Sequence, residues 1–103
     1  MSAQQIIDQI KLATDFQINK KILKEKIDTD LLIVYKDGLF KCDYSLIAFL
    51  SIWDQDELYL EDSYNNPICV NRLELLALCK QHYQLVMNQW HAEYIKLQSI
   101  RKI

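Results

Sequence analysis

The chain has 103 residues, of which 50% are hydrophobic and 25% are charged, and its net charge is −2. These values exclude a disordered chain and indicate a globular protein. With one glycine and one proline there is no flexible linker, so we expect a single domain over residues 1–103. No apolar run approaches the roughly 20 residues of a membrane helix, and the N-terminus has no secretory signal. The sequence therefore predicts a cytoplasmic protein without a membrane span.

The cysteines and the charge distribution further narrow the class of protein. Cys42, Cys69 and Cys79 are odd in number and widely spaced, which favours reduced, buried thiols over a disulfide framework. Residues 31–70 carry a net charge of −5, whereas residues 71–103 carry +3. The acidic middle of the chain disfavours nonspecific binding of phosphate groups there.

The N-terminal segment, residues 2–27, is predicted to be helical. Ser2 is a suitable N-cap, and apolar residues from Ile6 to Ala13 follow helical spacing. The pattern slips at Thr14, and Asn19 is placed to cap a second helix. We therefore expect a helical segment that is interrupted near its middle.

Residues 31–70 are predicted to form the β-rich core. Asp-Gly at positions 37–38 lies between two apolar runs, which is the strongest short-range signal of a β-hairpin. In the register that this turn implies, Tyr35 faces Phe40 and Ile33 faces Cys42.

The rest of this core contains one ambiguous segment. Residues 43–53 fit a helix that Asp43 caps, which we favour, or a strand that is buried on both faces. Residues 57–62 alternate with period two, and residues 68–70 form a short strand after a turn at residues 64–67. The fold class is therefore α+β, with a small antiparallel sheet of three to five strands.

The last element is a long amphipathic helix over residues 71–102. Asn71 is its N-cap and Glu74 completes a capping box, while Arg101 and Lys102 suit the negative end of the helix dipole. Such a helix is roughly 47 Å long, whereas a compact domain of this size is about 34 Å across. The helix is therefore expected to extend past its own domain.

The distal part of this helix carries the predicted partner-binding residues. Its apolar stripe recurs with a seven-residue period, which indicates helix pairing. This apolar stripe can be buried by the N-terminal helix or by another chain. We favour another chain, in a homodimer or higher oligomer. The predicted residues are Tyr83, Val86, Met87, Trp90, Tyr94 and Leu97.

Patterns that carry catalytic or metal chemistry are weak. Cys79 and His82 have a metal-ligand spacing, but no third ligand stands nearby in the sequence. The acidic run from Asp54 to Asp62 lacks the glycine of a calcium loop, so we interpret it as a solvated loop. No nucleophile elbow and no phosphate-binding loop is found. We therefore predict no catalytic residue, no metal, no cofactor and no enzymatic activity.

Residues 34–62 resemble the first motif of Sm/LSm proteins. Residues 34–38 match a strand with Asp-Gly, Trp53-Asp54-Gln55 matches an aromatic-Asp loop, and residues 58–62 match a Leu-x-Leu-Glu-Asp strand. The resemblance implies an Sm- or SH3-like partial barrel that binds RNA. Glu57 stands where the family has its base-binding asparagine, so the residues that read the bases are degenerate.

A second resemblance covers most of the chain. The stretches LYLEDSYNNPICVNR and HYQLVMNQWHAEYIKLQSIRK are similar to small uncharacterised proteins of contractile-tailed phages of marine cyanobacteria. This resemblance implies a phage-encoded protein and assigns no activity. The leading hypothesis is therefore a non-enzymatic, self-associating protein-interaction module, and the alternative is an Sm-like RNA-binding module.

Overall fold

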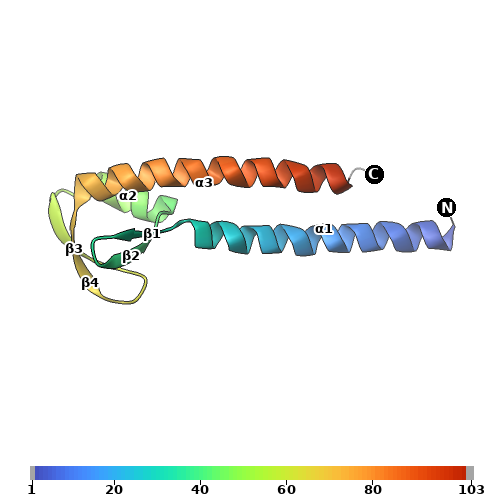
Figure 1. The fold of residues 1–103 in the computed structure, drawn as a ribbon, viewed down its shortest axis with the longest axis horizontal. Coiled ribbons are helices and arrows are strands. Elements are labelled where there is room, and N and C mark those ends of the chain that lie inside the picture. Colours follow the sequence, from blue (N-terminus) through green and yellow to red (C-terminus); the bar gives the residue numbers. More distant parts are fainter. Residues whose placement is uncertain (1, 102–103) are drawn as a thin grey trace.

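The computed structural model describes residues 2–101 and contains three helices and four strands in the order α1–β1–β2–α2–β3–β4–α3. Two long antiparallel helices, α1 (Ala3–Asp30) and α3 (Arg72–Arg101), lie side by side, and the remaining elements form a head at one end (Figure 1). This confirms the α+β class. Lys102, the last residue of the predicted C-terminal helix, lies outside the described residues.

The molecule is elongated because the two helices project from the head. Its principal extents are 65 × 23 × 19 Å, and its radius of gyration is 19.3 Å. A compact chain of about 100 residues has a radius of gyration of about 13 Å. The two long helices therefore extend well beyond the head (Figure 1).

α1 is one continuous helix from Ala3 to Asp30, so the predicted interruption was wrong. Ser2 is confirmed as its N-cap, because the Ser2 hydroxyl accepts the N–H of Gln5, and the Gln5 side chain accepts the N–H of Ser2 in return. At the predicted break, the Thr14 hydroxyl donates to the Ile10 carbonyl at 2.9 Å, so this polar side chain is satisfied within the helix. No glycine or proline occurs in α1 to stop it.

The first hairpin pairs β1 (Leu32–Tyr35) with β2 (Gly38–Lys41), in a register two residues away from the predicted one. Tyr35 lies opposite Gly38, because the two-residue turn is Lys36-Asp37, with Lys36 at φ 52°. A shift of two residues leaves each side chain on its original face. Tyr35 and Phe40 are therefore still packed together, with ring centroids 6.4 Å apart.

Gly38 belongs to the strand because of a close approach to the second hairpin. A Cβ atom at this position would lie 2.8 Å from both Ile68 Cγ1 and Phe40 Cε2. These separations are shorter than van der Waals contact, so a side chain would push the two hairpins apart. The only glycine thus serves packing between hairpins, and the turn takes its positive φ from a lysine.

The ambiguous segment is helical, as favoured from the sequence. α2 (Tyr44–Ile52) begins after Asp43, whose carboxylate accepts the N–H of Leu46 at 2.9 Å. The second hairpin pairs β3 (Glu57–Glu61) with β4 (Pro67–Asn71). Asn65 in its turn has φ 64°, which fits the turn predicted there.

The four strands form two separate two-stranded sheets, so the prediction of one sheet of three to five strands was wrong. The outer edge of β2 is occupied by the turn of the second hairpin. The Leu39 N–H donates to Asp62 Oδ2 at 3.1 Å, and the Ser63 N–H donates to the Leu39 carbonyl at 2.7 Å. A side chain and a loop thus take the place that a third strand would fill.

The start of α3 is joined to the first hairpin by Tyr35. Asn71 is confirmed as the N-cap, because its side chain accepts the N–H of Glu74 at 3.0 Å. The Tyr35 hydroxyl accepts the N–H of Asn71 at 3.4 Å and donates to Glu74 Oε1 at 2.9 Å. Burial and the bond to Glu74 raise the pKa of Tyr35. The Tyr35 hydroxyl therefore bridges the Asn71 N–H and the Glu74 carboxylate, the two groups that a capping box would join directly.

Candidate interaction surface

The predicted partner-binding stripe packs against α1 of the same chain. Leu23, Ile27 and Leu31 of α1 form a buried cluster with Val86 of α3. The other five residues of the stripe are half-buried against this cluster: Tyr83, Met87, Trp90, Tyr94 and Leu97. Of the two covers that the sequence left open, the structure shows the intramolecular one. Binding of a partner by these residues stays a prediction.

Polar and aromatic contacts hold the two helices in this antiparallel alignment. His82 Nε2 lies 2.6 Å from the carbonyl oxygen of Asp30, the last residue of α1. This contact satisfies one of the carbonyls that a helix leaves without a partner at its C-terminus. Farther along, Phe16 packs on Tyr94 with ring centroids 6.4 Å apart.

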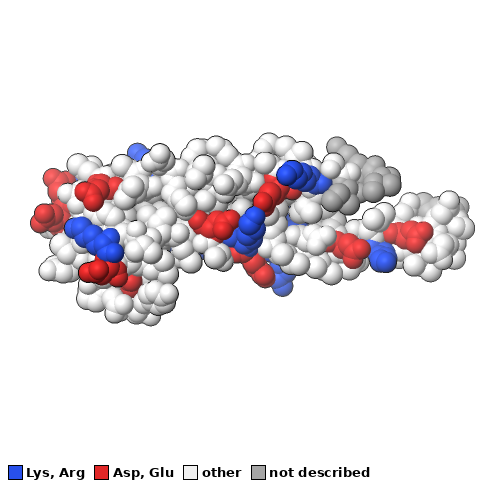
Figure 2. Space-filling view, viewed as in Figure 1, with Lys and Arg blue, Asp and Glu red and all other residues white. Residues whose placement is uncertain are grey.

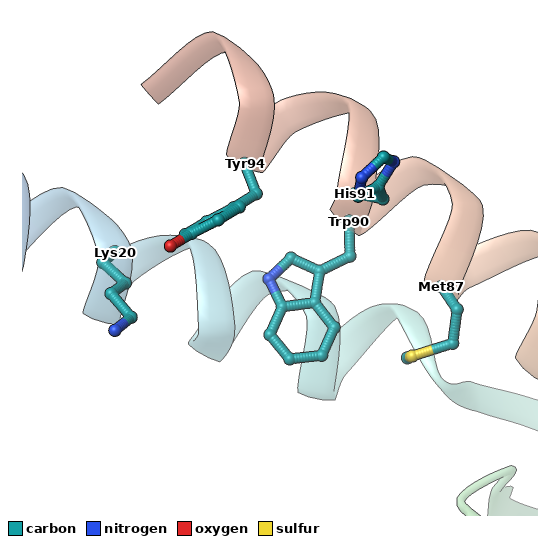
Figure 3. Close-up of a pocket in the computed structure, with 5 residues that line it drawn as sticks. All are labelled: Lys20, Met87, Trp90, His91 and Tyr94. Carbon is teal, nitrogen blue, oxygen red and sulfur yellow. The ribbon is translucent and has the colours of Figure 1, made fainter. Parts of the chain in front are cut away.

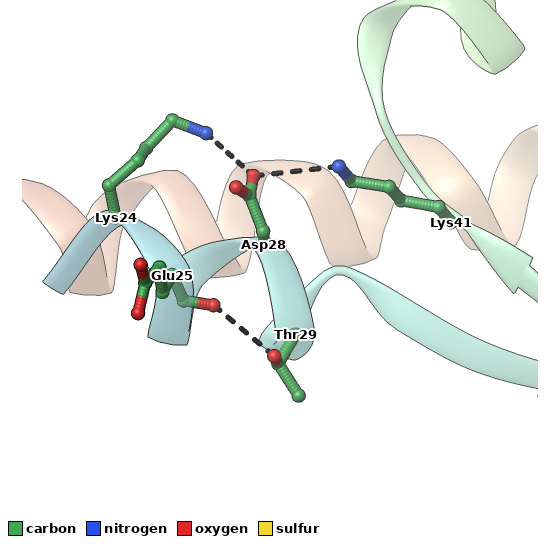
Figure 4. Close-up of polar contacts among 5 residues, drawn as sticks. All are labelled: Lys24, Glu25, Asp28, Thr29 and Lys41. Atoms are coloured by element: carbon green, nitrogen blue, oxygen red, sulfur yellow. Dashed lines mark hydrogen bonds and ion pairs between the residues drawn. The ribbon is translucent and has the colours of Figure 1, made fainter. Parts of the chain in front are cut away.

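Charged side chains bridge α1 to its neighbours at the surface. Asp28 Oδ1 lies 2.6 Å from Lys24 Nζ and 3.5 Å from Lys41 Nζ, which connects α1 to β2 (Figure 4). The hydrogen bond from Lys24 and the charge of Lys41 lower the pKa of the Asp28 carboxyl. Lys26 Nζ pairs with Glu93 Oε1 at 2.7 Å, and this bond raises the pKa of Lys26. These exposed pairs favour the alignment but stabilise it little.

A pocket of about 300 Å³ interrupts the seam between the two helices. Trp90, Tyr94, Met87 and His91 of α3 line it, with Lys20 of α1 opposite them (Figure 3). Lys20 lies seven residues before Ile27, so it takes a position on α1 that an apolar residue would fill in a continuous seam. The aromatic part of the stripe is therefore only partly covered.

An uncovered apolar surface lies at the start of α1. We call residues 3–15, which precede the first buried residue, Phe16, the α1 overhang. All of its residues are exposed, and its first turns extend beyond the last described turn of α3 (Figure 1). Ile6, Ile7 and Ile10 are 45%, 57% and 60% exposed. The helical segment that stays uncovered is thus at the start of α1, whereas the sequence placed it on the C-terminal helix.

The α1 overhang separates apolar from charged residues. Ala3, Ile6, Ile10 and Ala13 follow the alternating spacing of three and four residues that places them on one face. The charged residues of the overhang fall on the opposite face: Asp8, Lys11 and Asp15. The apolar face therefore carries no charge.

The remaining surface charges are mixed. Figure 2 shows acidic and basic side chains in small clusters along the viewed face, with acidic side chains gathered at the head. This agrees with the net charge of −5 in residues 31–70. The viewed face presents no broad basic area of the kind that binds nucleic-acid phosphates.

The structure does not bring together the residues considered for a metal. Cys79 is fully buried beside Cys42, whereas His82 is turned to the end of α1. Over residues 2–101, no three His, Cys, Asp or Glu side chains are grouped so that they could hold a metal ion. Within the same range, no helix has both the length and the apolar character to cross a membrane.

One residue of the acidic run has a structural role that the sequence analysis missed. Asp62 is only 5% exposed, and its carboxylate accepts the N–H groups of Leu39, Tyr64 and Asn66. These bonds lower the pKa of the Asp62 carboxyl. A signal existed, because aspartate before an Asn-Pro turn can bond the backbone that follows it.

The residues of the Sm-like resemblance are divided between the two hairpins. Residues 34–38 run from β1 through the turn to the first residue of β2, residues 53–55 follow α2, and residues 58–62 lie in and just after β3. α2 occupies the interval between Gly38 and Leu58.

Comparison with known proteins gives no match: no protein-family model, no curated protein and no solved structure is significantly similar to this chain.

Proposed function

We propose that this protein is a non-enzymatic protein-interaction module that self-associates through the apolar face of the α1 overhang. The single observation that carries the proposal is the exposure of Ile6 and Ile10 on one face of a helix segment that no described residue buries. Apolar side chains that are exposed together on one face form a patch, and such patches mark protein–protein interaction sites, whereas single scattered ones do not.

A second copy of the chain is the partner that this face fits best. Two identical apolar faces can pair without placing like charges against each other, because Asp8, Lys11 and Asp15 lie on the opposite side of the helix. The spacing of Ala3, Ile6, Ile10 and Ala13 is that of a helix-pairing seam. Self-pairing would remove these side chains from water, which is the main driving force of association.

Sedimentation equilibrium from a few to several hundred micromolar tests this proposal. We expect the wild-type mass to rise with concentration, and the double variant Ile6→Gln/Ile10→Gln to remain a monomer. Both side chains are exposed, so the variant should fold as the wild type does.

The matched control is Ile18→Gln/Ile22→Gln, which changes two exposed isoleucines with the same spacing on another face of α1. This variant should associate like the wild type. A wild-type chain that is monomeric at every concentration would refute self-association. Loss of association in the control alone would refute the assignment to the α1 overhang.

A further inference from the structure

Two cysteine side chains meet in the core of the head. Cys42, between β2 and α2, and Cys79, in α3, are both fully buried, and their sulfur atoms are 3.1 Å apart. They are separated by 37 residues in the sequence. Apolar side chains surround them, among them Leu50 and Leu75. The third cysteine, Cys69, is exposed on β4.

We propose that Cys42 and Cys79 are a disulfide-forming pair, oxidised by a small-molecule disulfide such as glutathione disulfide. A disulfide has an S–S length of about 2.05 Å, so the two sulfur atoms need to approach by only about 1 Å. The fold already holds the two thiols together, which makes formation of the bond an intramolecular step. Formation of this bond does not depend on self-association.

The oxidation is a pair of thiol–disulfide exchanges. The thiolate of Cys79 attacks one sulfur of glutathione disulfide, which forms a mixed disulfide and releases one glutathione thiolate. Cys42 then loses its proton to that thiolate and attacks the Cys79 sulfur, and the second glutathione leaves as a thiolate that takes up the proton from Cys79. Two protein thiols and one glutathione disulfide thus become one protein disulfide and two glutathione thiols.

The shared hydrogen bond assigns the order of attack. The Cys42 S–H donates to the Cys79 sulfur, which favours the Cys79 thiolate and lowers the pKa of Cys79. The same bond and burial raise the pKa of Cys42. Since both sulfurs are buried, the first attack takes place on a locally opened head or before packing is complete.

The test is an equilibrium measurement on the full chain in glutathione redox buffers, with and without denaturing urea. After acid quenching and alkylation, peptide mass mapping gives the fraction of chains with a Cys42–Cys79 bond. We expect this fraction to be at least about tenfold higher in native buffer than in urea at the same glutathione ratio, because only the fold places the thiols together. Equal fractions in the two conditions would overturn the proposal.

Two variants and one stability measurement complete the test. Cys69→Ser should form the bond as the wild type does, whereas Cys42→Ser should form no protein disulfide at Cys79, because the second exchange has lost its attacking thiol. The oxidised wild type should have a higher Tm than the reduced one, because the bond constrains the unfolded chain over 37 residues. A lower Tm after oxidation, or disulfides that form mainly through Cys69, would refute the assignment of Cys42 and Cys79 as the disulfide-forming pair.

Discussion

Individual polar side chains join parts of this fold that are far apart in the sequence. Asp62 binds the edge of the first hairpin from the turn of the second, and His82 binds the end of α1 from the middle of α3. Arg72 donates to the Leu50 carbonyl at the end of α2 and to the Asp56 carboxylate. Side chains therefore join the two hairpins to each other, α3 to α1 and α3 to α2, in addition to apolar packing.

Asp62 makes the stability of the head depend on pH. The folded state lowers the pKa of Asp62 below its ordinary value of 3.8, so its contribution to stability is present above about pH 4 and is lost as the pH falls through the folded pKa. We expect Asp62→Asn to lower the urea midpoint at pH 7 and to have a smaller effect at pH 3. Urea unfolding at the two pH values measures this. Asp54→Asn, at an exposed acid between α2 and β3, should leave both midpoints unchanged.

At the scale of elements, the sequence predicts best where local signals and periodicity agree. The caps at Ser2, Asp43 and Asn71 and the strands of both hairpins are where the residues indicate them. The hairpin register was wrong because Asp37-Gly38 is the usual turn pair, whereas Gly38 is needed in β2 for contact with Ile68. That contact is tertiary, and no local pattern contains it.

The cover of the α3 stripe was left open for a similar reason. A period of seven residues shows that a helix has an apolar face, but it does not say which surface packs on that face. The choice of α1 depends on contacts between distant residues, such as Phe16 with Tyr94 and Lys26 with Glu93. Because a break was expected near Thr14, the sequence did not predict that α1 is a single helix long enough to cover the α3 stripe.

The packing of α1 on α3 predicts unequal effects of two identical substitutions. Ile27 is 1% exposed and Ile22 is 57% exposed on the same helix. Ile27→Ala should lower the free energy of unfolding by about 2–4 kcal/mol, because it leaves a cavity in the seam. Ile22→Ala should change it by less than about 0.5 kcal/mol. Urea denaturation followed by tryptophan fluorescence measures both, and similar losses in the two variants would contradict this packing.

The whole molecule is a small head from which two long helices project, and the two helices pack on each other over only part of the length of α1. From Phe16 onward, α1 is supported by α3, whereas residues 3–15 have no described neighbour that buries them. Isolated helices shorter than about 12–15 residues are marginal in water. In a dilute solution the first turns of α1 therefore depend on the supported part alone.

If pairing of two chains supplies the missing support, helix content becomes a function of protein concentration. The mean far-UV circular dichroism per residue should become more helical between about 1 and 300 μM, over the range in which the mass rises. Ile6→Gln/Ile10→Gln should remove this dependence, and a constant signal in the wild type would count against it. The chain would then complete its fold by mass action, so its local abundance would determine how much of α1 is a helix at any moment.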